Sequence, residues 1–407
     1  MGTSQSLIAL DHAKGAHNYH PVEVVLTRAK GSFLWDVEGQ RYIDMMGAYS
    51  TASLGHCHPQ ILKALKQQAK RLDVTSRAFY NDQLPPWLDL LTQLAHADKA
   101  LPMNSGAEAV ETALKLARKW GETVKGIPKD RCEIIACEGN FHGRTLGLIS
   151  MSTDPQYKAN FGPLLPGIKT VPYGDAKALA KAITPRTAAF IIEPIQGEAG
   201  IRVPPEGFLQ NAEALCRKHN VLFIVDEIQC GLARTGRMFC YEHDDVTPDL
   251  LILGKALGGG VYPVSAVVGR GDVLGVFKPG DHGSTFGGNA IAAAVSMKAL
   301  ELLSDPALIA RAQRLGDWAQ KFLRKRLNHV PHVRDIRGKG LLIGVEVAPD
   351  IGARQIVEAL VPHGVLTKDS HEVVVRLAPP LNIKKKHLRQ ALEAVTNVVQ
   401  KARAKTS

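Results

Sequence analysis

A single lysine stands where an apolar stretch meets a run of glycines in the segment LLILGKALGGG, residues 250–260. The apolar residues 250–253 are typical of a buried strand. Lys255 follows after one glycine, and three further glycines occupy 258–260. The simplest interpretation is that Lys255 is the first solvated residue after the strand. It can also be a nucleophilic amine at the mouth of a sheet, because glycines let a bulky group approach the backbone.

An acidic residue, Asp226, closes another apolar stretch, VLFIVDE at residues 221–227. Taken alone, an acid in this place is more often a turn residue or a helix cap. A carboxylate after one central strand and a lysine after another are, however, the pair that pyridoxal phosphate requires. The lysine forms a Schiff base, and the acid pairs with the pyridinium nitrogen so that the ring acts as an electron sink. Asp226 and Lys255 are therefore the candidate catalytic residues.

The segment NSGAEAVETALKLARKW, residues 104–120, predicts a helix start that suits a phosphate group. Apolar residues recur at helical spacing after it, and Ser105 with Glu108 fits a capping box. Backbone N–H groups at a helix N-terminus bind phosphate. The residues expected to hold the phosphate of the cofactor are Ser105, Gly106 and Ala107. Without a phosphate ligand, the same pattern describes an ordinary helix N-terminus.

Four short apolar stretches must position these groups: 133–137, 188–194, 221–227 and 250–253. Because they are continuous and alternate with helical patterns, they predict an α/β fold with a mostly parallel sheet buried on both faces. Ligands of such sheets lie at the carboxyl ends of the strands. The polar residues that follow these strands are Glu193, Asp226, Glu227 and Lys255.

The pattern changes near residue 296, where long amphipathic helices and two strands, GLLIGVEV and EVVVRLAPPL, predict a smaller α+β domain. The length of 407 residues also favours a large domain with a smaller partner. We expect residues 1–45 to pack with the small domain, 46–295 to form the large cofactor-binding domain, and 296–407 to form the small domain.

The composition indicates a soluble cytoplasmic protein. The net charge is +11, but much of the excess lies in segments such as KKKHLRQ and KFLRKRL, where basic residues share helices with regularly spaced leucines. No nucleic-acid-binding motif accompanies them, and no apolar run is long enough to span a membrane. We therefore expect neither a nucleic-acid nor a membrane partner.

The six cysteines and the segment GHCHP, residues 55–59, provide no convincing metal site. The cysteines form no CxxC pair, which suits reduced thiols. His56 and His58 could bind a metal, but no further ligands are spaced to complete a site. A turn before a helix that starts at Pro59 is favoured instead.

Nine motifs in order resemble the class III family of pyridoxal-phosphate aminotransferases, over residues 15 to 380 and beyond. They are GAHNYHPVEV, TSRAFYND, PMNSGAEAVETALKLARKWG, GNFHGRT, EPIQGEAG, DEIQCGLARTGR, LGKALGGGVYPVSAV, HGSTFGGN and RLAPPL. The resemblance implies fold type I. GGGVYPVSAV, HNYHP and TSRAFYN favour the ornithine-specific branch, which moves the δ-amino group of L-ornithine to 2-oxoglutarate and forms glutamate 5-semialdehyde and L-glutamate.

Two other functions remain open. Within the same class, the chain could act on N-acetylornithine or another ω-amino acid. From a different class, a basic binding module could keep the enzyme fold without its activity. That rival predicts colourless protein and salt-sensitive binding of nucleic acid, and the intact lysine, aspartate and phosphate motif argues against it.

The resemblance assigns cofactor contacts residue by residue. Lys255 is similar to the Schiff-base lysine and Asp226 to the partner of the ring nitrogen. Gln229 would contact the phenolic oxygen of the ring and Phe141 would stack on its face, with His142 beside it. Several ornithine enzymes carry tryptophan at the position of His142. Thr285 is similar to a residue that reaches the cofactor phosphate of a neighbouring subunit, which implies a homodimer or an assembly of dimers.

The substrate contacts also follow from the resemblance. Tyr19 and Arg144 would hold the carboxylate of ornithine, for which a planar guanidinium is well suited. Tyr49 resembles the specificity residue near the α-amino group. Arg376 matches the arginine that binds the α-carboxylate of 2-oxoglutarate, and Glu198 matches the acid that covers this arginine while ornithine is bound.

Overall fold

The large sheet of the computed structural model, which describes residues 2–404, has seven strands in the order β4-β10-β9-β8-β7-β5-β6. Their bounds are β4 Lys99–Met103, β5 Glu133–Cys137, β6 Ile168–Val171, β7 Thr187–Ile192, β8 Leu222–Asp226, β9 Leu250–Leu253 and β10 Ser265–Gly269. Strand β10 runs antiparallel to both of its neighbours, and strands β6, β5, β7, β8 and β9 run parallel to one another. The predicted α/β fold with a mostly parallel sheet is confirmed.

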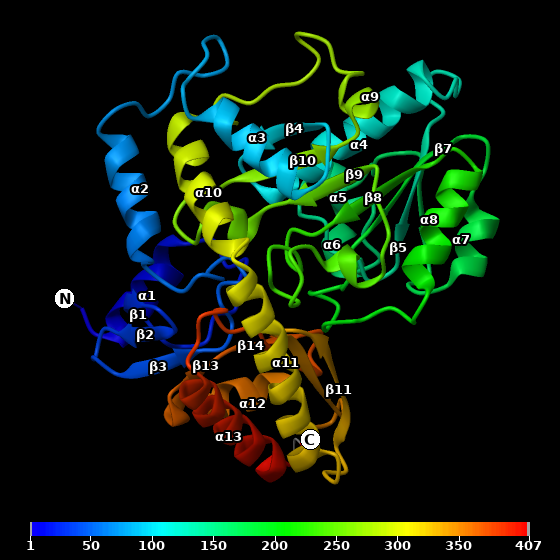
Figure 1. Cartoon of the computed structure of the whole chain (residues 1–407). Helices are drawn as coiled ribbons and strands as arrows, with labels where there is room; N and C mark the ends of the chain where they lie inside the picture. The colour runs from blue at the N-terminus through cyan, green and yellow to red at the C-terminus, as the bar shows by residue number, and fades with distance from the viewer. Residues whose placement is uncertain (1, 405–407) are drawn as a thin grey trace.

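Helices cover both faces of this sheet (Figure 1). Along β8, Leu222 and Ile224 join one apolar cluster with helix α4, Gly106–Thr123. Phe223 and Val225 point the other way and join the larger cluster with α8, Phe208–Lys218. Because every residue of β8 is buried, the strand reads as a continuous apolar run. The remaining helices of this region are α2 Pro59–Ala69, α3 Leu84–Leu94, α5 Leu146–Ile149, α6 Pro155–Lys158, α7 Ala176–Ala182 and α9 Gly271–Leu274.

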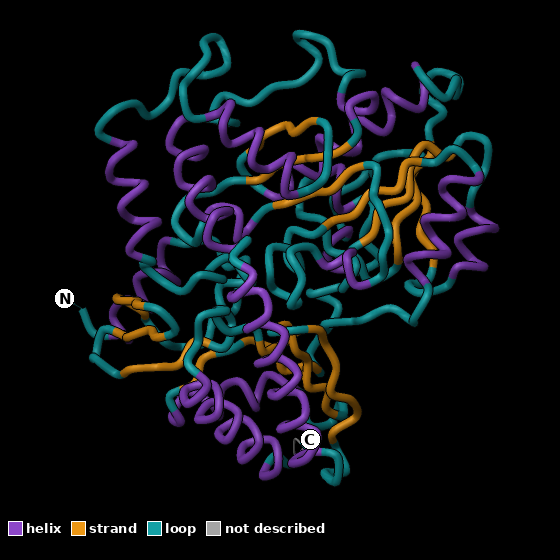
Figure 2. Tube along the Cα trace, in the orientation of Figure 1, coloured by secondary structure: helices purple, strands orange, loops and turns teal. Residues whose placement is uncertain are grey.

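A second layer of helices and strands follows the long helices α10, Ala290–Leu303, and α11, Pro306–Leu327. A four-stranded sheet has the order β11-β12-β15-β14, and helices α12 and α13 pack with α11 beside it (Figure 2). The bounds are β11 Val333–Lys339, β12 Leu342–Val347, α12 Ala353–Leu360, β14 Lys368–Ser370, β15 Val374–Leu377 and α13 Lys385–Lys401. Strands β12 and β15 are the two expected from the sequence.

The N-terminal segment forms its own small sheet with a strand from the far end of the chain. After α1, Ser4–Lys14, strands β1 Leu26–Lys30, β2 Phe33–Asp36 and β3 Arg41–Asp44 pair in order, and β13, Val365–Leu366, adds to β3 in parallel. The first 45 residues are thus hydrogen-bonded to a segment of the C-terminal region. The domain boundaries at 45 and 295 remain predictions.

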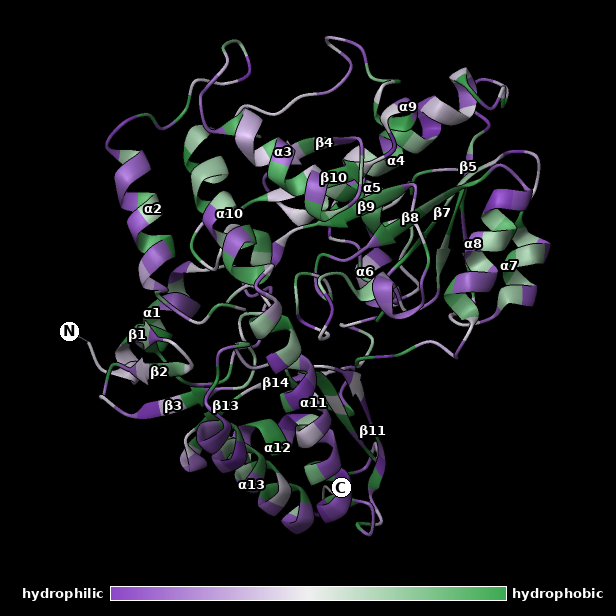
Figure 3. Cartoon of the chain, viewed as in Figure 1, coloured by the Kyte–Doolittle hydropathy of each residue, from purple (hydrophilic) through white to green (hydrophobic). Residues whose placement is uncertain are grey.

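Hydropathy follows the layers: the strands of the large sheet are apolar, while α11 and α13 carry polar residues on part of their surface (Figure 3). The basic segments KFLRKRL and KKKHLRQ lie in these two helices, as expected from the sequence. Pro59 starts α2, which agrees with the helix predicted after GHCHP. In the part of the chain that the structure describes, no helix is long and apolar enough to cross a membrane.

Candidate active site

A cavity of about 200 Å³ lies at the carboxyl ends of the central strands. It gathers residues from the start of α4 and from the loops after β5, β7, β8 and β9. Its lining consists of Gly106, Ala107, Phe141, His142, Gly143, Glu193, Ile195, Asp226, Ile228, Gln229, Cys230 and Lys255. Seven of the predicted cofactor residues therefore meet around one space, at the edge of the sheet where ligands of α/β proteins bind.

Lys255 begins a single 3-10 turn, Lys255–Gly258, directly after β9. Its φ of 45° lies in the left-handed region, which is uncommon for a residue with a side chain. Burial lowers the pKa of its amine below the ordinary value, although the negative charges of Glu198 and Asp226 oppose this shift. A larger neutral fraction makes the amine a better nucleophile and base.

Asp226 is held by two hydrogen bonds. Its Oδ1 accepts from the backbone N–H of Ile228 at 3.0 Å, and its Oδ2 lies 2.7 Å from Nδ1 of His142. The side chain of His142 is completely buried. Burial lowers the pKa of His142, but the hydrogen bond to Asp226 and the charge of Asp226 outweigh this effect, so the pKa is raised. The two hydrogen bonds fix the orientation of the Asp226 carboxylate at the cavity wall.

The start of α4 fits an anionic group. Ser105 Oγ accepts from the N–H of Glu108 at 3.2 Å, and Glu108 Oε2 accepts from the N–H of Ser105 at 2.6 Å, so the predicted capping box is present. The N–H groups of Gly106 and Ala107, in the first turn, have no intrahelical partner. Both residues line the cavity, and Ala107 packs against Gly143, where an added Cβ would lie 3.2 Å from Cβ of Ala107 and 2.5 Å from Cδ1 of Leu148.

These residues fit pyridoxal phosphate. The helix start suits its phosphate, Asp226 suits its ring nitrogen, and Lys255 suits its aldehyde carbon. In residues 2–404, the buried Nε2 of His142 has no hydrogen-bond partner within the protein. An unpaired buried polar atom destabilises a fold by about 1–3 kcal/mol, so it is expected where a ligand completes the site.

An ion pair between a buried arginine and a partly buried glutamate lies beside this cavity. Arg376, in β15, is 1% exposed, and its Nη2 lies 2.7 Å from Oε1 of Glu198. The same nitrogen donates to the carbonyl of Gly197 at 2.9 Å. Burial raises the pKa of Glu198, but the charge of Arg376 opposes this effect and prevails, so the pKa falls to about 2. Glu198 is therefore ionised at neutral pH.

Gln229 and Tyr49 complete this cluster. The amide nitrogen of Gln229 donates to Glu198 at 3.0 Å and its oxygen accepts from Arg376 at 3.2 Å. Gln229 was predicted to contact the cofactor, whose cavity it lines, and in the structure it also joins the cavity to the ion pair. The guanidinium of Arg376 lies 5.3 Å from the ring centre of Tyr49. Burial and the charge of Glu198 raise the pKa of Tyr49 to about 12, so its hydroxyl stays protonated.

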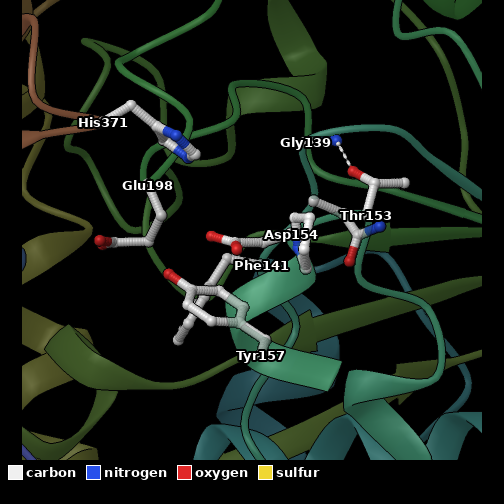
Figure 4. Close-up of a pocket in the computed structure, with 9 residues that line it drawn as sticks. Gly139, Phe141, Thr153, Asp154, Tyr157, Glu198 and His371 are labelled. Atoms are coloured by element: carbon white, nitrogen blue, oxygen red, sulfur yellow. Dashed lines mark hydrogen bonds between the residues drawn. The ribbon is translucent and has the colours of Figure 1, made fainter. Parts of the chain in front are cut away.

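A second cavity of about 310 Å³ adjoins the first, sharing Phe141 with it (Figure 4). It is lined by Gly139, Asn140, Phe141, Thr153, Asp154, Pro155, Tyr157, Glu198 and His371. Arg144 lies at this side of the site, with its guanidinium carbon 3.5 Å from the ring centre of Tyr157 and 5.4 Å from that of Phe141. The predicted acid Glu198 lines this cavity, and the predicted substrate arginine Arg144 packs on two of its lining rings, Phe141 and Tyr157.

Six of the predicted residues line neither cavity: Tyr19, Tyr49, Ser105, Arg144, Thr285 and Arg376. Tyr19 is 76% exposed, although it is near enough to Tyr49 to contribute to the raised pKa of the Tyr49 hydroxyl. Thr285 is exposed in the loop before α10 and lines neither of the two cavities. Its assignment to the cofactor of a neighbouring subunit remains a prediction.

Two site residues received no role from the sequence. Glu193 was noted only as an acid after a strand; burial raises its pKa to about 8, and its Oε2 accepts from the N–H of Phe141 at 3.0 Å. It therefore fixes the loop that carries Phe141. Tyr157 lies in the four-residue helix α6, which is too short to leave a periodic pattern.

The family model for class-III aminotransferases matches residues 14–399, so the chain belongs to this family. It is 54% identical over 398 residues to an ornithine aminotransferase from Geobacillus, covering 98% of this chain and 99% of that protein. It resembles the solved ornithine aminotransferase from Toxoplasma gondii with a TM-score of 0.96, at 46% identity, covering 98% of this chain and 95% of that one.

An acetylornithine aminotransferase from Elizabethkingia anophelis is also similar, with a TM-score of 0.89, 45% identity, and coverage of 98% of this chain and 99% of that one. A further Toxoplasma gondii ornithine aminotransferase structure is described with partial occupancy of PLP at its active site. The predicted enzyme class, a pyridoxal-phosphate-dependent aminotransferase of fold type I, is confirmed.

Proposed function

We propose that this protein transfers the δ-amino group of L-ornithine to 2-oxoglutarate, forming glutamate 5-semialdehyde and L-glutamate. The observation that carries the proposal is the ion pair between Glu198 and the buried Arg376 beside the Lys255 cavity. A site that must accept both a diamino acid and a diacid needs a positive group for the second carboxylate of the diacid. That group has to be neutralised by a movable acid when the diamino acid is bound. Similarity to ornithine aminotransferases over nearly the whole chain supports the same substrate pair.

Each cofactor residue then has a defined task. Ser105, Gly106 and Ala107 would hold the phosphate at the start of α4. Asp226, oriented by His142 and by the N–H of Ile228, would pair with the ring nitrogen. Phe141 would stack on the ring. When bound, pyridoxal phosphate supplies an electron sink for the carbon that loses its proton.

Lys255 carries the cofactor and moves the proton. Its lowered amine pKa increases its neutral fraction, which favours taking the proton from the δ-carbon of ornithine and later returning it. The δ-amino group must therefore face Lys255, while the carboxylate of ornithine is held at a distance by Arg144 and Tyr19. Tyr49 lies near the α-amino group.

In the other half-reaction, Arg376 binds the α-carboxylate of 2-oxoglutarate. Glu198 must leave Arg376 first, and the adjoining cavity that Glu198 lines gives its side chain space to move. With ornithine, Glu198 stays on Arg376 and neutralises it. One site thus accepts two substrates of different charge.

We propose that the active unit is a homodimer in the cytoplasm, with Thr285 contributing to the cofactor phosphate site of the partner subunit. The resemblance that assigned Thr285 and its exposed position support this role. Sedimentation of the purified protein should give twice the chain mass of 44.1 kDa. A monomer with full activity would refute the shared site.

A panel of amino donors tests the reaction itself. With 2-oxoglutarate as acceptor, L-ornithine should be preferred over N-acetylornithine by at least about tenfold in kcat/KM, and trapping of the cyclised semialdehyde identifies the product. A preference for N-acetylornithine would instead place this chain with the similar acetylornithine aminotransferase.

The cofactor-bearing residue is tested separately. Purified protein should be yellow, and borohydride should fix the cofactor to a single peptide that contains Lys255. Lys255→Ala should lose this covalent link and nearly all turnover, because no other amine lines the cavity in residues 2–404. Fixation to a peptide without Lys255 would show the assignment to be wrong.

A further inference from the structure

The guanidinium of Arg144 lies directly over the ring of Tyr157. Its central carbon is 3.5 Å from the ring centre, which is a close stacking distance and the shortest cation–aromatic contact in residues 2–404. The ring of Phe141, the predicted stacking partner of the cofactor, contacts both residues: its centre is 5.4 Å from Arg144 and 6.1 Å from the ring centre of Tyr157. The three side chains form a single cluster, in which Phe141 lines both cavities and Tyr157 lines the second one.

Helix α6 holds Tyr157 firmly in this place. Asp154 caps the helix by accepting from the N–H of Gln156 at 2.9 Å, and Pro155 follows at its start. Lys158 reaches back to the carbonyl of Ser152 with its amine at 2.9 Å. The helix is therefore anchored at both ends, and the Tyr157 ring projects into the cavity (Figure 4).

Arg144 has no comparable support of its own. It is exposed, and within the described residues its guanidinium forms no ion pair with a carboxylate. It follows Gly143, whose φ of 136° is accessible to glycine and strained for other residues. A long side chain on such a loop loses much rotamer freedom when it binds an anion, unless something orders it beforehand.

From this geometry we propose that the ring of Tyr157 is a specificity-determining platform that orders Arg144 to bind the substrate carboxylate remote from the reacting amine. The ring stacks against the flat face of the guanidinium and leaves the N–H groups at the edge of the guanidinium free to donate hydrogen bonds. Those N–H groups are the ones that bind a carboxylate in bidentate fashion. The inference deepens the proposed function and depends on it.

The charges around Tyr157 indicate that its ring, and not an ionised hydroxyl, attracts Arg144. Burial raises the pKa of Tyr157, and the nearby carboxylates of Asp154 and Glu198 raise it further, although Arg144 opposes them. The hydroxyl is therefore neutral, and the attraction to Arg144 comes from the ring face.

The test compares an amine that has the remote carboxylate with one that lacks it. L-Ornithine and 1,4-diaminobutane present the same amine on the same carbon chain, and single-turnover absorbance of the bound cofactor follows each. Tyr157→Leu should lower the rate per donor concentration for ornithine by roughly 5- to 30-fold, and that for 1,4-diaminobutane by less than about twofold. Tyr157→Met, whose side chain has about the same volume but is longer and more adaptable, serves if the leucine variant folds poorly.

The conservative variant and a double substitution isolate the ring. Tyr157→Phe keeps the ring face and should restore the ornithine rate to within about threefold of the unaltered protein. In protein that already carries Arg144→Leu, the Tyr157→Leu change should add less than about twofold, because the platform then has nothing to order.

These measurements distinguish a failure of the Tyr157 platform from a failure of the proposed ornithine activity. If Tyr157→Leu slows both amines equally, or if Tyr157→Phe is as slow as Tyr157→Leu, the platform is refuted while ornithine turnover by the unaltered protein stands. If the unaltered protein does not convert ornithine, the proposed function fails, and the platform fails with it.

Discussion

At the scale of residues, the pair of Glu198 and Arg376 determines which substrate the site accepts. A hydrogen bond between charged groups contributes about 1.5–3 kcal/mol. L-Glutamate has to break this bond before its α-carboxylate reaches Arg376, whereas ornithine does not. Removing the acid in Glu198→Ala should therefore speed the half-reaction with L-glutamate relative to ornithine by roughly 10- to 100-fold. Arg376→Ala should spare ornithine and impair 2-oxoglutarate. Single-turnover absorbance with each amino donor measures both ratios, and an unchanged ratio in Glu198→Ala would rule out the switch.

The same pair also predicts a dependence of stability on pH. The folded pKa of Glu198, about 2, lies below its ordinary value of 4.5. A lowered carboxyl pKa stabilises the fold fully above the ordinary value, and this contribution is lost as the pH falls from about 4.5 toward 2. Glu198→Gln should flatten the decline in urea midpoint over that range. A variant curve parallel to that of the unaltered protein would contradict the low pKa.

At the scale of elements, the start of α4 combines a structural cap with an anion site. Glu108 accepts hydrogen bonds from the backbone N–H groups of Asn104 and Ser105, at 3.2 and 2.6 Å. Glu108→Ala should cost about 1 kcal/mol of stability, and it should weaken cofactor retention because the first turn is less well ordered. Thermal melting of the protein without cofactor and cofactor release on dilution measure the two effects. Unchanged values in both would show that the capping box does not support the site.

The elements also show what a sequence can predict. Strands β5, β7, β8 and β9 were predicted because burial on both faces makes them continuous apolar runs. Strand β4, KALPM, has an exposed lysine and a proline, and β6 is only partly buried, so neither has such a pattern. Asp226 was found because it closes a predicted strand, and Lys255 because it follows one after a single glycine. Tyr157 was not, since its role depends on a ring and a guanidinium brought together by folding.

At the scale of the whole molecule, one buried arginine joins segments that are far apart in the sequence. Arg234 is fully buried and donates to the carbonyls of Leu341 and Pro379 at 3.1 and 2.6 Å, and to Oγ of Ser53 at 2.9 Å. Burial lowers its pKa to about 9, which the charge of Asp44 partly opposes. These bonds link the region that carries Lys255 to the one that carries Arg376.

The two reacting ends of the site should therefore depend on Arg234, although it touches neither cavity. Arg234→Met leaves three buried acceptors without a donor, so we expect it to lower the free energy of unfolding by about 3 kcal/mol or more. Arg237→Met, in the same loop but exposed, should change it by less than about 0.5 kcal/mol. Because Arg376 would be held less firmly relative to Lys255, the KM for 2-oxoglutarate should rise more than the rate of borohydride fixation at Lys255 falls. Urea unfolding and steady-state kinetics on both variants measure these effects. Equal stability of the two variants would show that Arg234 does not hold these segments together.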